Sequence, residues 1–288
     1  MRFGICPTPH PWWESRKQLH NWISLVESVG FDAIFLPDHC MLPIISNNLV
    51  DAWVTLSYIA AITEHVRLGT NVSPITRYMP SYLAKMLATV DYLSNGRIIA
   101  GLGAGAIPEE FINFSFGFDP PSVRVDKFQE SVEILLKLWT EDKVSYNGQY
   151  YKLKDAVLLP KPVQKPHPPL WSGCLGNRML KITAKYFNGW IFPRSVPKAY
   201  LPIQEFVSRV KIIKDYAANY GKDLGNFTFA VLGSINDSLE IIEEYEKAGC
   251  NYYIVELFKG PGLSNPYSPN EYLSVTKKFA QEVVSSFI

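Results

Sequence analysis

The dipeptide Asp38-His39 carries the side chains best suited to chemistry in this sequence. It follows an apolar run at residues 33–37, so both side chains stand directly behind a predicted buried strand. A carboxylate beside an imidazole can orient the ring or hold its charge, and such a histidine can exchange a proton with a substrate oxygen near neutral pH. The alternative is that Asp38 and His39 only tie down their loop by hydrogen bonds. We expect the catalytic role, with His39 as the proton-exchanging group.

Two further carboxyl groups, Glu109 and Glu110, follow Pro108 at an expected helix start. Carboxylates in a first helical turn stabilise the helix dipole by about 0.3–1 kcal/mol each, so a structural role explains both. The alternative is a proton donor near a bound cofactor, and Glu109 is our candidate for it.

The segment GLGAGA at residues 101–106 has the loose form of a dinucleotide-binding fingerprint. That fingerprint belongs in the first strand–helix unit, with an acidic residue about 20 positions later at the end of the next strand. Here the glycines follow the fourth predicted strand, and Asp119 and Asp126 fall in a loop and a helix. We therefore reject a nicotinamide dinucleotide site. Glycines at a strand end instead let a bulky group approach the backbone closely.

A second glycine-containing turn, at residues 173–178, follows another apolar run. Backbone N–H groups at the start of the following helix form a ready anion site, to which Arg178 can add charge. The alternative for Arg178 is a plain surface arginine. Three cysteines also fall near predicted strand ends, but they lack metal-ligand spacing, so we predict buried apolar thiols and no metal site. They are Cys6, Cys40 and Cys174.

Positioning these candidates requires a series of strand–helix units. The predicted strands are unbroken apolar runs, as expected of parallel strands covered on both faces. A helical segment follows each one, and glycines such as Gly30 and Gly249 stand where a helix gives way to the next strand. Eight such units in 288 residues predict an α/β fold, a (β/α)8 TIM barrel that forms one domain over residues 1–288. The predicted strands are 2–6, 33–37, 66–72, 97–103, 169–173, 189–192, 227–232 and 252–257.

One insertion interrupts the series between the fourth and fifth units. Residues 141–168 contain strand-like runs around Asn147-Gly148, a hairpin turn signal, and then a proline-rich stretch. We predict a hairpin followed by an extended segment.

Charge and hydropathy limit the partners. The net charge is +1 and no dense run of lysine and arginine is present, which argues against nucleic acid or an anionic membrane as the main partner. The longest apolar stretch, around residues 52–62, is too short to span a bilayer. A strand is expected from residue 2, with no room for a signal peptide, so we expect a cytoplasmic protein that acts on a small molecule.

In this order, the units resemble the bacterial-luciferase-like superfamily of flavin- and deazaflavin-dependent barrels. The resemblance covers almost the whole chain and is carried by GFDAIFLPDH (30–39), VRLGTNVSPITRYMP (66–80), LAKMLATVDYLSNGRIIAGLGAG (83–105) and NRMLKITAKYFNGWIF (177–192). It implies a homodimer that binds FMN or the 5-deazaflavin coenzyme F-420 at the carboxyl-terminal mouth of the barrel. The Asp-His pair and the segments after strands three and five look like the deazaflavin branch.

The resemblance also implies cofactor-binding residues. Relatives kink the third strand with a non-proline cis peptide that backs the central ring of the cofactor, and the corresponding bond here is Asn71–Val72. The cofactor phosphate is expected near residues 173–178, and Trp12 and Trp13 either wall the pocket or pack their own loop. The predicted cofactor-binding residues are Cys6, Asn71, Val72, Ser73, Gly103, Ala104, Gly105, Gly173, Cys174, Gly176, Asn177 and Arg178, and the predicted catalytic residues are His39, Asp38 and Glu109.

Three functions are compatible with this resemblance. The first is hydride transfer between coenzyme F-420 and a small organic substrate. The second is an FMN-dependent monooxygenase that uses oxygen and reduced flavin from a separate flavin reductase. The third is a non-catalytic flavin-binding barrel, against which an intact Asp38-His39 pair argues. Ala106 stands where deazaflavin-dependent glucose-6-phosphate dehydrogenases carry an acidic residue, so that activity is not expected.

Overall fold

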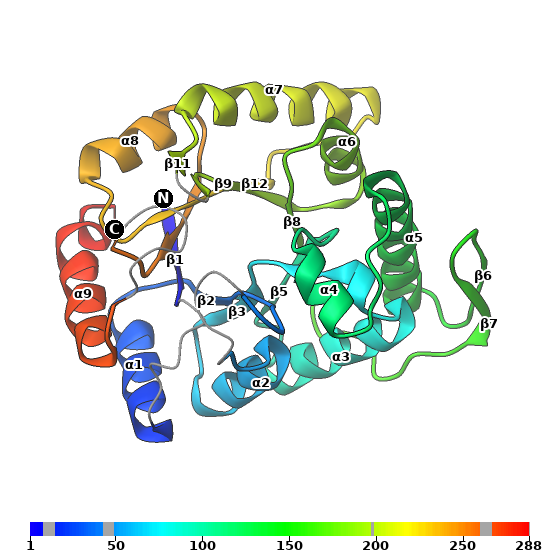
Figure 1. Cartoon of the computed structure of the whole chain (residues 1–288), viewed down its shortest axis with the longest axis horizontal. Helices are drawn as coiled ribbons and strands as arrows, with labels where there is room; N and C mark the ends of the chain where they lie inside the picture. The colour runs from blue at the N-terminus through cyan, green and yellow to red at the C-terminus, as the bar shows by residue number, and fades with distance from the viewer. Residues whose placement is uncertain (8–14, 43–48, 197–198, 260–266, 288) are drawn as a thin grey trace.

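The computed structural model describes residues 1–7, 15–42, 49–196, 199–259 and 267–287. Within these ranges, eight parallel strands form a closed barrel, as predicted, with helices around it (Figure 1). The pairing of β3 with β5 completes the ring, and β4 continues β3 after a break at residues 71–72. The barrel strands are β1 (Arg2–Cys6), β2 (Ala33–Leu36), β3 (Arg67–Thr70) with β4 (Ser73–Pro74), β5 (Ile98–Gly103), β8 (Leu170–Gly173), β9 (Gly189–Pro193), β12 (Thr228–Ser234) and β13 (Tyr252–Glu256).

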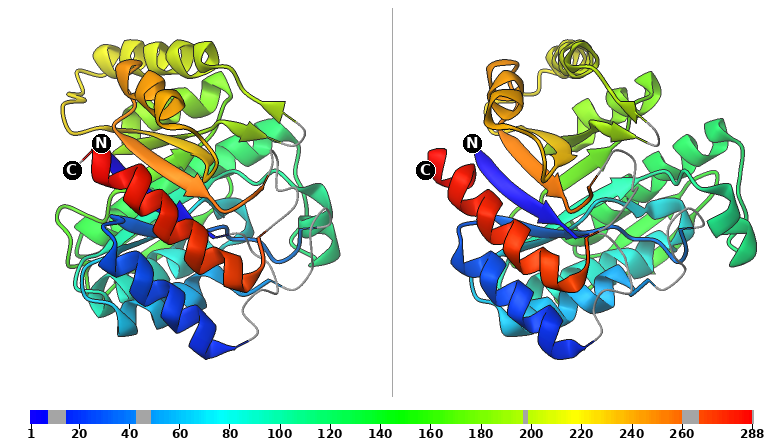
Figure 2. Two further views of the ribbon diagram at one scale, coloured as in Figure 1. Left: turned by 90° about the vertical axis from the view of Figure 1, so that its left-hand side faces the viewer. Right: turned by 60° about the vertical axis from the view of Figure 1, so that its left-hand side comes forward.

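Apart from α4, which lies at the carboxyl ends of the strands, the helices lie outside the strands and cover them (Figures 1 and 2). They are α1 (Arg16–Ser28), α2 (Ala52–Ile62), α3 (Pro80–Leu93), α4 (Pro108–Asn113), α5 (Pro121–Thr140), α6 (Asn177–Tyr186), α7 (Ile203–Asn219), α8 (Leu239–Lys247) and α9 (Pro269–Glu282), with 3-10 turns η1 (Ile75–Arg77) and η2 (Val284–Ser286). None of the helices in the described ranges is long and apolar enough to cross a membrane. The two ends of the chain lie side by side, and the centres of the Phe3 and Phe287 rings are 5.3 Å apart.

The predicted insertion hairpin is confirmed. Strands β6 (Val144–Asn147) and β7 (Lys152–Ala156) pair antiparallel and project from the edge of the barrel beside α5. The Glu130 carboxylate, from α5, accepts hydrogen bonds from the N–H groups of three successive turn residues at 2.7–3.1 Å, which holds the turn against the barrel. A second short hairpin, β10 (Ser195–Val196) with β11 (Ala199–Tyr200), follows β9.

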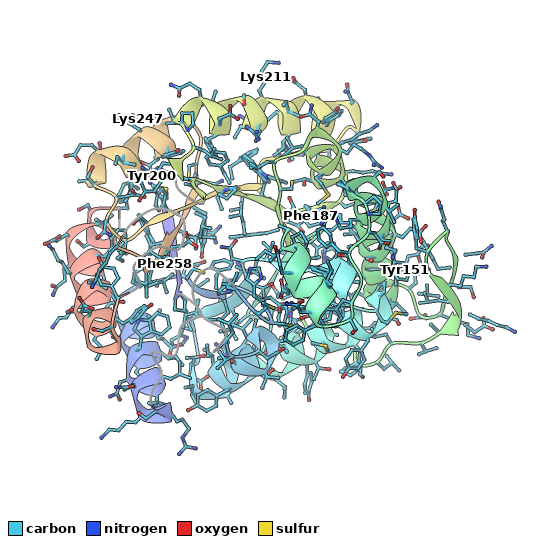
Figure 3. All side chains as sticks on the ribbon, in the orientation of Figure 1. Tyr151, Phe187, Tyr200, Lys211, Lys247 and Phe258 are labelled. Carbon is cyan, nitrogen blue, oxygen red and sulfur yellow. The ribbon has the colours of Figure 1, made fainter. Side chains whose placement is uncertain are left out.

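Two apolar layers hold the fold together. One lies between strands and helices, where Phe187 stacks on Phe128 of α5, while Lys211 and Lys247 point outward from α7 and α8 (Figure 3). The other fills the barrel interior around Phe35. A Cβ added at Gly4 or Gly69 of the neighbouring strands would lie 2.7 or 2.6 Å from the Phe35 ring, so these two glycines make room for it.

Candidate active site

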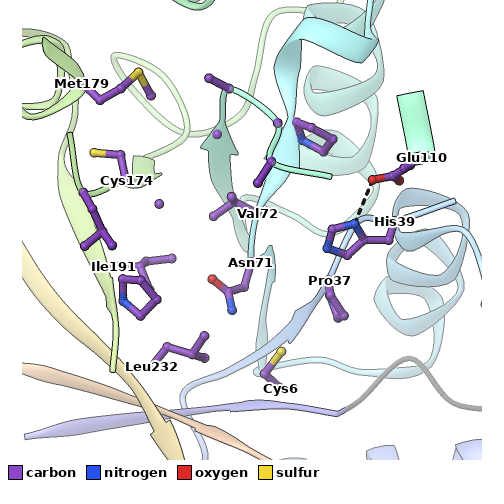
Figure 4. A pocket seen from close by; sticks show the side chains of 18 of the residues that line it. Cys6, Pro37, His39, Asn71, Val72, Glu110, Cys174, Met179, Ile191 and Leu232 are labelled. Atoms are coloured by element: carbon purple, nitrogen blue, oxygen red, sulfur yellow. Dashed lines mark hydrogen bonds and ion pairs between the residues drawn. The ribbon is translucent and has the colours of Figure 1, made fainter. Parts of the chain in front are cut away.

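A cavity of about 480 Å³ lies at the carboxyl ends of the barrel strands. This volume is within the range of small-ligand sites. Its walls are mainly apolar, and Figure 4 shows His39 and Asn71 pointing into a space that Ile191 and Leu232 border on the other side. Among the described residues, the titratable or charged side chains that line it are His39, Glu110, Arg124, Glu256, Cys6 and Cys174.

His39 is held by Glu110 rather than by its neighbour in sequence. The imidazole Nδ1 lies 3.0 Å from Oε2 of Glu110, which comes from α4. The other carboxylate oxygen accepts hydrogen bonds from the backbone N–H of Cys40 at 2.6 Å and from Nη1 of Arg77 at 2.7 Å. Because an ionised carboxylate only accepts hydrogen bonds, Nδ1 donates to it and Nε2 of the neutral ring is free to exchange a proton.

The electrostatic environment keeps Glu110 ionised, although its side chain is only 1% exposed. Burial alone would raise the pKa of this carboxyl. Hydrogen bonds from His39 and from the N–H of Cys40, together with the charge of Arg77, outweigh burial and hold the pKa below its usual value. Glu110 is therefore a fixed negative partner for the imidazole.

Asp38 serves Arg77, which corrects the expectation that Asp38 orients the His39 ring. Its carboxylate pairs with Nη2 of Arg77 and accepts a hydrogen bond from the Tyr78 hydroxyl at 2.8 Å. Burial raises the pKa of the Tyr78 hydroxyl, and the charge of Asp38 raises it further, so this hydroxyl stays a donor. Arg77 thus joins two buried carboxylates, and the sequence signal for it was a lone arginine directly after the third strand.

Glu109 lies on the exposed side of α4, whereas Glu110 is buried. Successive residues on a helix differ in direction by about 100°, so only one of the two can face the barrel. The proton-donor expectation placed on Glu109 therefore does not fit the geometry, since Glu110 is the acid beside His39.

The peptide bond between Asn71 and Val72 is cis, as predicted. The Val72 side chain occupies the space beside two strand-end glycines. A Cβ added at Gly103 would lie 2.7 Å from Cγ2 of Val72, and one added at Gly173 would lie 2.9 Å from Cγ1. The close approach expected at these glycines is thus made by a valine side chain that also lines the cavity.

This packing gives a direct test. Gly103→Ala is expected to lower the free energy of unfolding by about 1–3 kcal/mol, since an added methyl group in a filled core causes strain of that size. Val72→Ala in the same chain should recover most of the loss, measured by urea denaturation of the two single variants and the double variant. Additive losses in the double variant would show that Gly103 is needed for another reason.

Other predicted cofactor residues divide into two groups. Cys6, Asn71, Ala104, Gly105 and Cys174 line the cavity. The hydroxyl of Ser73 does not: it accepts from the indole of Trp53 at 3.0 Å and donates to Thr70, which fixes the break between β3 and β4.

The turn at residues 176–178 also lies off the cavity wall. Gly176, Asn177 and Arg178 are exposed at the start of α6, and the Arg178 guanidinium pairs with Asp126 of α5. Trp12 and Trp13 lie outside the described residues.

Arg124, which the sequence reasoning passed over, lines the cavity from the first turns of α5. Its Nη1 donates to the carbonyl of Gly105 at 3.1 Å, and the guanidinium lies 3.9 Å from the centre of the Phe118 ring. Its Nε is buried without a hydrogen-bond partner among the described residues. A buried, unused donor on a cation suits an anionic group of a ligand.

The barrel, its apolar cavity at the strand ends and the carboxylate-held histidine define a barrel enzyme of small-molecule chemistry. Residues 1–250 match the family model of the luciferase-like monooxygenases, and the chain belongs to that family. It is an oxidoreductase.

Curated relatives and solved structures agree with this membership. An uncharacterized protein of Mycobacterium tuberculosis is 31% identical over 218 residues, 69% of this chain and 73% of the relative. An F-420-dependent glucose-6-phosphate dehydrogenase of Microbacterium testaceum is 32% identical over 180 residues, 61% of this chain and 52% of the relative. A monooxygenase of Streptomyces bottropensis shares the fold with a TM-score of 0.83 at 20% identity over 100% of both chains. An F-420-dependent secondary alcohol dehydrogenase shares it with a TM-score of 0.78 at 20% identity over 98% of both chains.

Proposed function

We propose that the protein transfers hydride between coenzyme F-420 and a small organic substrate. The observation that carries this proposal is the His39 imidazole, held by Glu110 on the wall of the cavity that Val72 also lines. The relatives named as F-420-dependent support the choice of cofactor.

The cavity residues fit this cofactor. Val72, Ile191 and Leu232 offer apolar surface for a flat ring system. Arg124 offers its unused Nε to the anionic side chain of the cofactor. The start of α6 at Gly176, two residues after the cavity-lining Cys174, offers backbone N–H groups. When bound, the deazaflavin accepts or supplies two electrons as a hydride.

We assign the accompanying proton transfer to His39. Oxidation of an alcohol to a carbonyl removes a hydride from carbon and a proton from oxygen, so a base must take the proton. Nε2 of His39 accepts it, and Glu110 stabilises the resulting imidazolium through Nδ1. In the reverse direction the same ring returns the proton to the carbonyl oxygen.

An anaerobic assay tests the proposal. Reduced F-420 is mixed with the protein and a panel of small ketones, and the oxidised cofactor is followed by absorbance. A separate aerobic arm supplies reduced FMN and oxygen with the same panel, and product formed from the substrate is measured there. Ketone-dependent oxidation of F-420 supports the proposal. Oxygen-dependent turnover with reduced FMN, together with no turnover with reduced F-420, would instead support an FMN-dependent monooxygenase.

A further inference from the structure

Glu256, at the carboxyl end of β13, places a carboxyl group on the floor of the same cavity. Side chains on a strand alternate in direction, and Tyr252 and Ile254 fill the barrel interior. Glu256 points the same way as these two and forms the next layer above Ile254. Its neighbours in register are Cys6 of β1 and Ser234 of β12.

This carboxyl has no use in the interactions described so far. Among the described residues it has no hydrogen bond and no ion pair, whereas Glu110 in the same cavity has three hydrogen-bond donors. Stability does not explain a carboxyl at the top of an apolar layer that is unpaired among the described residues, because burying such a group costs free energy.

The position of Glu256 separates it from Arg124, the cation proposed to hold the anionic part of the cofactor. In the eight-stranded ring, β13 stands four strands from β5, which is the opposite side. Arg124 and Glu110 both come from helices that follow β5. The cation suited to the cofactor is therefore on one side of the barrel and the unpaired carboxyl is on the other.

We propose that Glu256 is a specificity-determining residue that donates a hydrogen bond to a substrate oxygen in this cavity. This inference rests on the proposed function, since it assigns the substrate end of that same cavity.

The surroundings of Glu256 favour its neutral form. Burial, assisted by the charge of Asp237, raises the pKa of Glu256 to about 8. Among the described residues, the facing groups supply no compensating cation: β1 contributes the Cys6 thiol, itself with a raised pKa from burial, and the loop after β12 contributes Asp237. Arg194 of the loop after β9 is already engaged by both Asp237 oxygens, at 2.6 and 2.8 Å. At neutral pH Glu256 is thus a hydrogen-bond donor, and above pH 8 it becomes an anion.

The first measurement is an infrared titration of the cofactor-free protein from pH 5 to pH 10. Wild type is expected to show the carbonyl band of a protonated carboxylic acid that disappears with a midpoint near pH 8, and Glu256→Gln should lack it. A midpoint below pH 6, or the same band in Glu256→Gln, would overturn the inference.

The second measurement is binding of cyclohexanone, followed by ligand-observed NMR with F-420 present. Wild type should lose at least about tenfold in cyclohexanone affinity between pH 6 and pH 10, the scale of one hydrogen bond to a buried donor. Glu256→Gln, which keeps an N–H donor, should bind cyclohexanone independently of pH, and Glu256→Leu should bind it weakly throughout.

Wild-type affinity for cyclohexanone that does not change with pH would contradict the role of Glu256. F-420 binding is measured on the same samples. Absence of F-420 binding would contradict the proposed function without affecting the Glu256 titration. Ionisation of Glu256 with a midpoint below pH 6 would contradict only this inference.

Discussion

Arg77→Met is expected to lower the free energy of unfolding at pH 7 by about 3–5 kcal/mol, the usual cost of leaving buried charges without their partner. The Arg77 side chain is 4% exposed and pairs with Asp38 and Glu110, which are 2% and 1% exposed. Methionine fills a similar volume but supplies no positive charge. The loss is measured by urea denaturation of the purified variant.

The pH dependence of this loss has a defined sign. In the wild type the pKa of Glu110 is lowered, so its contribution to stability is present above the unfolded-state pKa of about 4.3 and is lost as the pH falls. The difference in the free energy of unfolding between wild type and Arg77→Met should therefore become smaller below pH 5.

Arg178→Met is the matched control for Arg77. The Arg178–Asp126 pair is 58% and 43% exposed, so its removal should cost less than about 1 kcal/mol. Equal losses for Arg77→Met and Arg178→Met would show that the buried network does not stabilise the fold as argued.

His39→Ala is expected to lower turnover by about 10²-fold or more, the usual scale of a positioned proton-transfer group, while F-420 affinity changes by less than about tenfold. The reason is that His39 exchanges the substrate proton through Nε2, while the side-chain hydrogen bond that it makes within the described residues is the one to Glu110. Single-turnover oxidation of reduced F-420 by a ketone substrate measures the rate, and a binding titration measures the affinity.

His65→Ala is the control for His39, because His65 is exposed and lies at the start of the third barrel strand, away from the cavity. It should leave turnover unchanged. Unchanged turnover in His39→Ala would return His39 to a loop-holding role.

The barrel and the insertion hairpin could be predicted because their signals are local. Apolar runs set the strands, and Asn147-Gly148 marked the turn region of the hairpin. The cis bond at Asn71–Val72 came from the resemblance rather than from any local signal.

The site interactions could not be predicted, because they join distant positions. His39 and Glu110 are 71 residues apart, and Arg77 joins Glu110 to Asp38 across 33 and 39 residues. The sequence pattern therefore favours the adjacent Asp38 as the partner of His39, whereas the structure places Glu110 there. The choice between Glu109 and Glu110 depended on the phase of a six-residue helix, which two adjacent acids do not reveal.

Glu256 was overlooked for a different reason. Glu256 is the last residue of a strand whose other residues are mainly apolar. Its two-residue spacing from Ile254 and Tyr252 is the sequence signal that it faces the barrel interior. The same period-two reasoning applies to the ends of β9 and β12, where Ile191 and Leu232 also line the cavity.

The central claim is that the cavity holds a deazaflavin, and titration of the cofactor-free protein with F-420 and with FMN, followed by absorbance and fluorescence, tests it most directly. We expect micromolar binding of F-420 and at least about tenfold weaker binding of FMN. Because the Arg124 guanidinium lines the cavity, Arg124→Ala should lose a further factor of about ten in F-420 affinity. Tighter binding of FMN than of F-420, or binding of neither, would contradict it.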